Sequence, residues 1–303
     1  MPTQTVYRRQ VMAALDEPGI FACSSATSTT AVIATLASSA SNHSPNQFAT
    51  AWIYHLALSQ VRIIREGSFI PGTGGMSVDP GWTAPTTNDE LEITALFPSI
   101  MAGALFAQVG TDTDYRTLIN RALSRLLAPD TISIPITTAT SYSLSTYAAW
   151  LDRPERLQYD QQGRMKLFEP AVVSGRRAFS AAWRRPRLIL DGAAPTLELD
   201  VPFTSATGNL TLHVLRPGDT LINGSESSVG LSAESDTALP SVNDVVTVTL
   251  MDAYRALMTR QSFRPSGRWK DRYDAQRKEA MALKYWDATQ MAPPVAAAVQ
   301  EAA

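Results

Sequence analysis

The sequence predicts an α+β protein: a helical bundle core with an inserted β region, preceded by an N-terminal β-rich module. Two segments carry apolar residues at helical spacing, one at about 112–127 and one at about 242–290. The segment between them, about 131–235, and residues 1–98 instead combine short β-branched and aromatic runs with Gly, Pro, Ser and Asn clusters. We therefore expect one domain at residues 1–98 and a core domain at residues 99–303.

The N-terminal module is predicted from short apolar runs that turn-forming residues separate. These runs cover residues 30–36, 51–56, 61–65 and 91–94. Residues 48–65 contain no clear turn signal, so a single helix is an alternative to two strands there. The segment Pro71–Gly75 resembles a phosphate-binding loop but lacks the following Lys-Ser/Thr. We interpret it as a hairpin turn, because glycines adopt the positive φ that such turns need.

The first helix is predicted from its cap and its apolar stripe. Asp112, Thr113 and Asp114 offer side-chain oxygens that can cap a helix, and Pro129 ends the pattern. Arg121 and Arg125 are expected to point away from the apolar face. That face consists of Tyr115, Leu118, Ile119, Ala122, Leu123 and Leu126.

The inserted region returns to the two-residue period of β-strands. Ile132, Ile134 and Ile136 alternate with Ser133 and Pro135, and Pro135 indicates an edge strand or a strand start. Further strands are expected at 188–190, 196–201 and 210–215.

Helical periodicity resumes at Val245 and breaks at Pro265–Gly267 before it continues to Trp286. The ends of the chain, residues 1–17 and the tail at 291–303, are predicted to be flexible, and the tail has too little apolar bulk to pack alone.

Composition bears on the expected partners, the redox environment and membrane association. The chain has 303 residues, of which 45% are apolar and 18% charged, and its formal net charge of -2 favours neither anionic nor cationic partners. Cys23 is the single cysteine, which suits assembly in a reducing cytoplasm, and we interpret it as a half-buried apolar residue. The longest apolar stretch, Ile100–Val109, is too short to cross a bilayer, so no membrane partner is expected.

No residue pattern indicates catalysis, a metal or a cofactor. The three histidines, His43, His55 and His213, lie in unrelated segments, and hydrolase, dinucleotide and Walker A motifs are absent from the sequence. The carboxylate pairs Asp89–Glu90 and Asp271 with Asp274 are interpreted as caps or solvated charges. We therefore expect a protein that is not an enzyme.

The densest basic tract lies within residues 175–187 and includes aromatic side chains. Arg and aromatic side chains together suit either a subunit interface or contact with nucleic acid. The interface is our preferred interpretation, and a DNA-facing channel is the alternative. The candidate residues are Arg176, Arg177, Trp183, Arg184, Arg185 and Arg187.

Several packing and turn motifs together resemble virion structural proteins of tailed bacteriophages, in particular head-to-tail adaptor (connector or neck) proteins. The core motifs are Thr117–Leu127, Ile132–Ile136, Tyr142–Leu144, Trp150–Leu151 and Arg153–Glu155. The N-terminal motifs are Phe48–Tyr54, Val61–Ile64, Val78–Trp82 and Leu91–Ile93.

The resemblance implies a ring of identical subunits, commonly twelve, that docks beneath the portal protein. Tail or nozzle proteins would bind below it, and the genome would pass through its centre with possible non-specific DNA contact. The protein would then reside in the virion neck or tail after assembly in the host cytoplasm. The alternatives are a tail terminator or baseplate component, a DNA-gating module, and a tail-associated glycan-degrading enzyme, which would need separated carboxylates in a groove.

Overall fold

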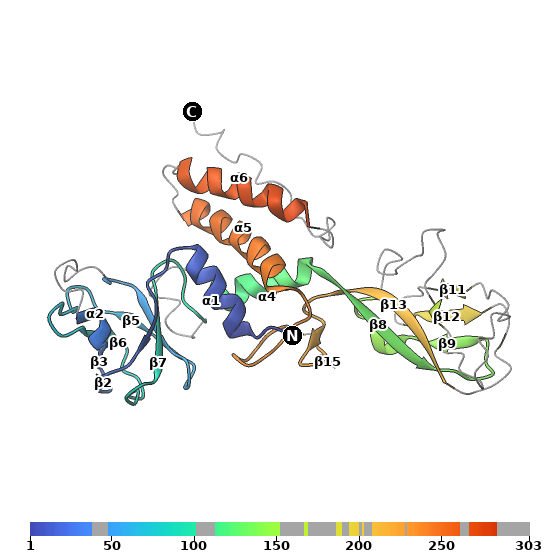
Figure 1. Ribbon diagram of the computed structural model, residues 1–303, viewed down its shortest axis with the longest axis horizontal. Helices are drawn as coiled ribbons and strands as arrows, with labels where there is room; N and C mark the ends of the chain where they lie inside the picture. The colour runs from blue at the N-terminus through green and yellow to red at the C-terminus, as the bar shows by residue number, and fades with distance from the viewer. Residues whose placement is uncertain are drawn as a thin grey trace, which may run out of the picture. The chain divides into compact units, whose positions relative to one another are not determined.

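The chain forms two compact units, each with its own hydrophobic core. Unit 1 comprises residues 1–126 and 221–303, and unit 2 comprises residues 127–220 (Figure 1). The predicted boundary near residue 98 therefore falls inside unit 1. The computed structural model describes residues 1–37, 48–100, 113–151, 167–168, 186–189, 194–199, 202, 208–227, 229–260 and 267–283.

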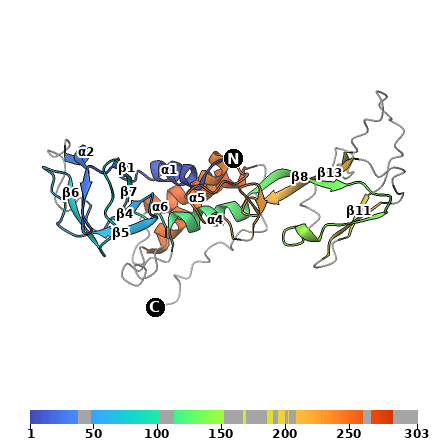
Figure 2. The ribbon, with the colours of Figure 1, turned by 90° about the horizontal axis from the view of Figure 1, so that it is seen from below.

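The predicted helical-bundle core is wrong, because the chain is mostly β. The described residues form a seven-stranded antiparallel sheet and several smaller sheets, with five α-helices beside them. The helical periodicities are real, but they produce separate helices of 11 to 19 residues, apart from the four-residue α2. The short β runs meanwhile pair into one continuous sheet, which is the largest layer of unit 1 (Figure 1, Figure 2).

The large sheet joins strands from the whole N-terminal region. Its strands, in spatial order, are β1 (Gly19–Ala22), β7 (Glu90–Thr94), β4 (Trp52–His55), β5 (Gln60–Ile64), β6 (Gly75–Asp79), β3 (Thr30–Val32) and β2 (Ser25–Ala26). A short helix, α2 (Ala34–Ala37), follows β3. β4 and β5 form a hairpin in which Ile53 pairs with Arg62, so the strand interpretation of residues 48–65 is confirmed and the single-helix alternative is not.

The central strand β4 is buried on both faces, which explains why its sequence shows no polar alternation. Ile53 packs into one cluster with Phe48 and Phe69, whose rings meet edge to face at 4.9 Å. Trp52 and Tyr54 point to the other cluster, with Val61 and Ile100. Cys23 lies in the first cluster at 1% exposure, so it is fully buried rather than half-buried.

Helices of unit 1 form a second packed group (Figure 1). They are α1 (Gln4–Ala14), α4 (Tyr115–Arg125), α5 (Val242–Arg260) and α6 (Gly267–Met281). One cluster joins α1, α4 and α5 through Val11, Leu118 and Ala253. Asp114 caps α4 by accepting a 2.6 Å hydrogen bond from the Thr117 amide, so the predicted cap is confirmed.

Two expectations about these helices are wrong. Residues 1–17 were predicted to be flexible, but α1 begins after its N-cap Thr3 and buries Tyr7, Val11 and Met12. Arg125 was expected to point away from the apolar face, but it is buried, and its Nη1 lies 2.7 Å and 2.9 Å from the Asp252 carboxylate oxygens. The pairing with α5 makes burial of this charge possible. The tail at 291–303 lies outside the described residues.

Unit 2 is a small β module built on a long antiparallel pair. β8 (Leu127–Pro135) pairs along its whole length with β13 (Asn209–Pro217). The other described elements are β9 (Ser141–Ser143), the 3-10 helix η2 (Ser145–Tyr147), β10 (Leu167–Phe168), β11 (Pro186–Ile189) and β12 (Thr196–Leu199). Their sheet orders are β10-β13-β8 and β11-β12-β9, and both sheets contribute to one core around Trp150, Leu197 and Leu212.

The chain re-enters unit 1 at the hairpin of β14 (Leu221–Ile222) and β15 (Ser225–Glu226). Residues 221–235, which the sequence assigned to the β insertion, thus belong to unit 1.

The turn at Pro71–Gly74 confirms the hairpin interpretation of this glycine-rich segment, which connects β5 to β6. Gly74 has a φ of +69°, and a Cβ at this position would lie 2.1 Å from the Ile33 carbonyl oxygen. Gly72, in the same turn, has open space around the corresponding position.

We expect Gly74→Ala to lower the free energy of unfolding by about 2 kcal/mol or more, because it adds backbone strain and a backbone clash. Gly72→Ala is the matched control and should change stability little. Urea titration followed by tryptophan fluorescence measures both, and equal stability of the two variants would contradict the close approach.

Candidate functional site

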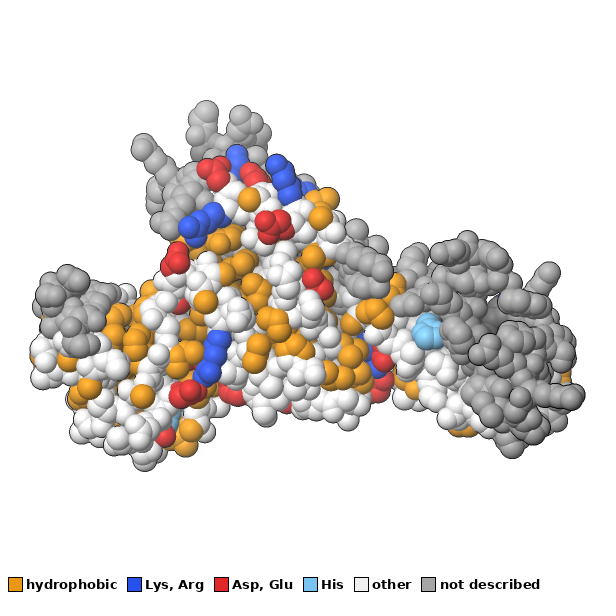
Figure 3. All heavy atoms as spheres, in the orientation of Figure 1, with side chains coloured by type: hydrophobic (Ala, Val, Ile, Leu, Met, Phe, Trp, Pro, Cys, Tyr) orange, Lys and Arg blue, Asp and Glu red, His pale blue; other side chains and the backbone are white. Residues whose placement is uncertain are grey.

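The predicted basic surface is only partly described by the structure. Arg176, Arg177, Trp183, Arg184 and Arg185 lie outside the described residues, and Arg187 is exposed on β11, where its register partner is Glu198 of β12. The interface or DNA role of this tract stays a prediction. On the face of unit 1 drawn in Figure 3, basic and acidic side chains are interspersed rather than gathered into a patch of one sign.

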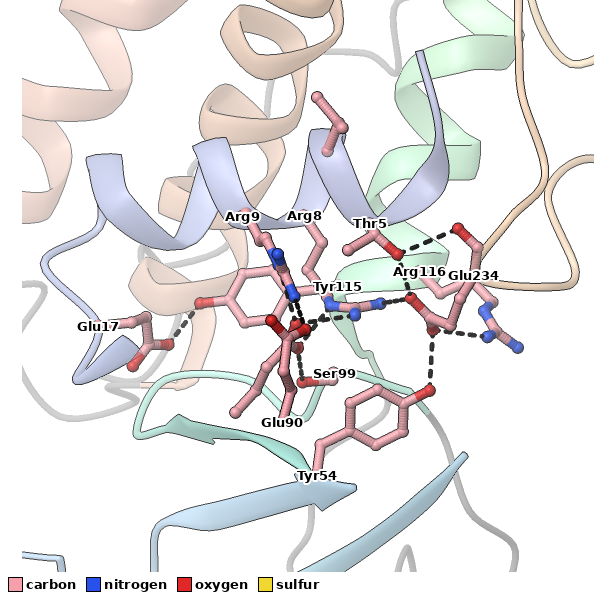
Figure 4. A network of polar contacts seen from close by, with 12 residues as sticks. Thr5, Arg8, Arg9, Glu17, Tyr54, Glu90, Ser99, Tyr115, Arg116 and Glu234 are labelled. Atoms are coloured by element: carbon pink, nitrogen blue, oxygen red, sulfur yellow. Dashed lines mark hydrogen bonds and ion pairs between the residues drawn. The ribbon is translucent and has the colours of Figure 1, made fainter. Parts of the chain in front are cut away.

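The strongest cluster of ionisable side chains is a buried network centred on Arg8 of α1 (Figure 4). Arg8 binds the Glu92 carboxylate of β7 with two bonds, Nε to Oε2 at 2.8 Å and Nη2 to Oε1 at 3.0 Å. Both side chains are fully buried. The guanidinium group also lies 5.1 Å from the ring centroid of Tyr54. The two carboxylates near Arg8, those of Glu92 and Glu234, raise its pKa although burial opposes the charge.

Glu234, in the loop between β15 and α5, extends this network by contacts with α1, α4 and β4 (Figure 4). Its carboxylate lies 2.6 Å from Arg8 Nη1 and 3.2 Å from Arg116 Nη2 of α4. It also accepts hydrogen bonds from Tyr54 OH at 2.8 Å and Thr5 Oγ1 at 3.0 Å. Burial opposes ionisation of Glu234, but the Arg8 charge and these hydrogen bonds outweigh it and hold the pKa below its usual value.

The network is balanced in charge and its members are engaged. Arg9 of α1 pairs with Glu90, and Ser99 Oγ donates to Glu92 Oε2 at 3.1 Å. A carboxylate that is buried against a bidentate guanidinium group holds its negative charge strongly and is a poor general base. The arrangement therefore fixes α1, β7, β4, α4 and the Glu234 loop together, which is a structural role.

Glu17 anchors the segment after α1 in a similar way. Its carboxylate accepts hydrogen bonds from the Ala95 amide at 2.6 Å, the Leu96 amide at 3.0 Å and the Tyr115 hydroxyl. Burial raises the pKa of Glu17 despite these hydrogen bonds. The contact joins the α1–β1 connection to the loop that leads from β7 toward α4 (Figure 4).

One His–carboxylate pair also occurs in unit 1. His55 Nε2 lies 3.0 Å from Asp89 Oδ2, and the same oxygen accepts a 2.7 Å hydrogen bond from the Thr86 amide. The Thr86 amide and His55 lower the pKa of Asp89. Burial and the Asp89 charge raise the pKa of the nearby Cys23 thiol, which disfavours the thiolate that a cysteine nucleophile requires. Asp89 thus caps a turn, whereas the sequence indicated a helix cap or a solvated charge.

Among the residues that the structure describes, no group of three His, Cys, Asp or Glu side chains is placed to hold a metal ion. His43 lies outside those residues, and His55 and His213 belong to different units.

The described helices include none with the length and apolar character needed to span a bilayer.

Comparison of the chain with protein-family models, with curated proteins and with solved structures found no significant match.

Sequence reasoning missed the Arg8 network because its members are far apart in the chain, with Arg8 and Glu92 separated by 84 residues. A signal was present in both segments. Glu92 interrupts the apolar run of Leu91 and Ile93, and Arg8 follows Tyr7 within a helical apolar pattern. A charge inside an apolar run is unusual unless it is paired.

We expect Arg8→Met to lower the free energy of unfolding by about 3–5 kcal/mol, because it leaves the buried Glu92 carboxylate without its partner. Arg9→Met is the matched control, since Arg9 and Glu90 are partly exposed, and it should cost about 1 kcal/mol or less. Urea unfolding followed by fluorescence compares the two variants. Equal losses of unfolding free energy would show that the buried Arg8–Glu92 pair contributes no more than the partly exposed Arg9–Glu90 pair.

Acid should destabilise unit 1 through Asp236, in the same loop as Glu234. Burial opposes its ionisation, but hydrogen bonds from the Ala233 and Ser232 amides outweigh burial and lower the pKa from 3.8 to about 2. Because the folded value lies below the unfolded one, this contribution to stability is complete above pH 3.8 and is lost as the pH falls through about 2. The difference in unfolding free energy between wild type and Asp236→Asn should therefore shrink over this window. A constant difference would contradict the assignment.

Proposed function

We propose that this chain is a virion structural protein of a tailed bacteriophage, a head-to-tail adaptor that assembles as a ring beneath the portal and joins it to the tail. The proposal starts from the resemblance carried by motifs such as Thr117–Leu127 and Trp150–Leu151. The observation that supports it best is the division of the described chain into two separately cored units. The genome would pass through the centre of the ring.

Two units give each subunit the two different faces that a ring needs. A ring closes by heterologous contacts, in which one face of a subunit binds a different face of the next. Unit 2 begins at Leu127 and ends at Thr220, and Leu127 pairs with Pro217, three residues before that end. It is therefore an inserted module, and unit 1 keeps its own core around Val11, Tyr115 and Leu257. Each unit can present a surface of its own without sharing a core with the other.

The edge of unit 2 favours contact through side chains over open-ended strand pairing. The Ile136 amide donates to the Gly208 carbonyl oxygen at 3.0 Å. Because amides in an antiparallel pair alternate in direction along the strand, the amides of Thr131 and Ser133 point away from β13. Pro129 and Pro135 share that outward register and have no amide to donate. The described outer edge of β8 thus offers few backbone N–H donors, which limits pairing with an edge strand of another molecule.

The ionisable groups of unit 1 suit a protein that acts by contact. Arg8, Glu92 and Glu234 are occupied with one another, and Asp89 caps a turn. Their roles are to hold elements in place. A structural subunit of a particle needs this rigidity, because its neighbours bind preformed surfaces.

The test is the oligomeric state of the full chain. We expect mass photometry and negative-stain imaging of the purified protein to show a hollow ring, with roughly twelve copies for the adaptor position. A monomer at all concentrations, alone and with a portal ring, would contradict the proposal.

A deletion variant locates the contact. Ala128 and Arg216 are paired, so residues 129–215 can be replaced by an Asn-Gly turn that closes the same two strands. Unit 1 should still unfold cooperatively, and ring formation should be lost. An intact ring would assign both faces to unit 1.

A further inference from the structure

The turn between β14 and β15 contains an Asn-Gly pair, Asn223–Gly224, whose chemical reactivity plays no part in the fold or in the proposed function. These two residues connect β14 to β15, have φ values of 54° and 76°, and are exposed at the surface. Positive φ at both positions is typical of the two-residue hairpin turn that Asn-Gly favours. An asparagine followed by glycine is also chemically labile, because glycine has no side chain to shield its backbone nitrogen.

The carboxamide of Asn223 is held by the loop at Asp236 and Thr237. Its Nδ2 donates to Asp236 Oδ1 at 2.8 Å, and its Oδ1 accepts from the Thr237 amide at 2.9 Å. The Asn223 amide also donates to the Thr237 carbonyl at 3.0 Å. Both ends of the carboxamide are therefore engaged with residues 236 and 237, and these hydrogen bonds limit the rotation that brings Cγ to the Gly224 nitrogen.

We propose that Asn223 is a spontaneous deamidation site that this clamp protects, so that its conversion records local opening of the β14–β15 hairpin. The inference is independent of the proposed function. It needs water as the only co-reactant.

Deamidation proceeds through a cyclic succinimide. The Gly224 backbone nitrogen loses its proton and forms a bond to Asn223 Cγ, the Cγ–Nδ2 bond breaks, and ammonia leaves. Water then opens the resulting succinimide ring at either carbonyl. One opening gives aspartate, and the other gives isoaspartate, in which the main chain passes through the side-chain carbon.

The product opposes closure of the clamp. A carboxylate at position 223 cannot donate to Asp236 Oδ1, and it places a second negative charge beside the first. Asp236 also accepts from the Ser232 and Ala233 amides, both at 2.7 Å, and so holds the loop that carries Glu234. Deamidation therefore acts in one direction, from a clamped loop to a loosened one.

The test compares the wild-type full chain in mildly alkaline buffer with and without urea. Proteolytic peptide mapping by mass spectrometry measures amide loss at Asn223, and chromatographic separation of the isomers identifies isoaspartate. Exposed Asn209 is the internal reference, since the following Leu210 hinders attack by its amide. In urea, Asn223 should convert faster than Asn209. In buffer, conversion of Asn223 should be suppressed at least about tenfold, the factor that an opening free energy of ~1.4 kcal/mol produces.

Asp236→Ala tests the clamp itself. It should raise the rate of amide loss at Asn223 in buffer while the rate at Asn209 stays unchanged. Equal rates at Asn223 with and without urea, or no preference for Asn223 over Asn209 in urea, would overturn the proposal. The wild-type comparison decides it even if the variant fails to fold.

Discussion

The paired charges of Arg8, Glu92 and Glu234, of which the first two are fully buried, are the constraint on which the arrangement of unit 1 depends. Removing a guanidinium group and two carboxylates from water is costly, and only close pairing offsets that cost. The fork of Arg8 matches Glu92 with two bonds, which fixes both the rotation of α1 and its position along β7. Apolar packing alone would tolerate small rotations of the helix. We therefore expect the ion pairs to contribute to the uniqueness of the arrangement, since a rotated helix would leave their charges unpaired.

Unit 1 consists of two segments of the chain, residues 1–126 and 221–303, and contacts around this network join them. The Gln4 amide donates to the Asp236 carbonyl at 2.8 Å, and Tyr7 OH donates to the Pro240 carbonyl at 2.7 Å. Glu234 follows the inserted unit in sequence and Arg8 precedes it, and the ion pair between them joins the two segments of unit 1. Unit 1 thus closes only after the chain has passed through unit 2 and returned. The long strand pair of unit 2 starts at Leu127 and Pro217, so both connections to unit 1 lie close to one paired position.

Elements with local signals were predictable, and their partners were not. The Asp114 cap and apolar stripe of α4 and the Gly74 turn follow from neighbouring residues. The pairing of β1 with β7 joins residues 19–22 to 90–94, a choice that strand periodicity leaves open, so the fold class was wrong. Arg125 was misassigned because its partner Asp252 lies on another helix. Of the predicted basic surface, Arg187 alone falls within the described residues.

Both units combine apolar packing with ion pairs of a buried arginine. In unit 1, Arg8 pairs with Glu92 and Glu234, which come from distant segments of the chain. In unit 2, Arg216 pairs with Asp130 at 2.8 Å, within a continuous nine-residue strand pair whose edge strand has proline at two outward positions. The two prolines limit strand addition at the outer edge of β8, because they leave only the Thr131 and Ser133 amides as outward donors between them. For the proposed ring, contacts between subunits would then be made by side chains, and closure would depend on the rotation that relates neighbouring subunits.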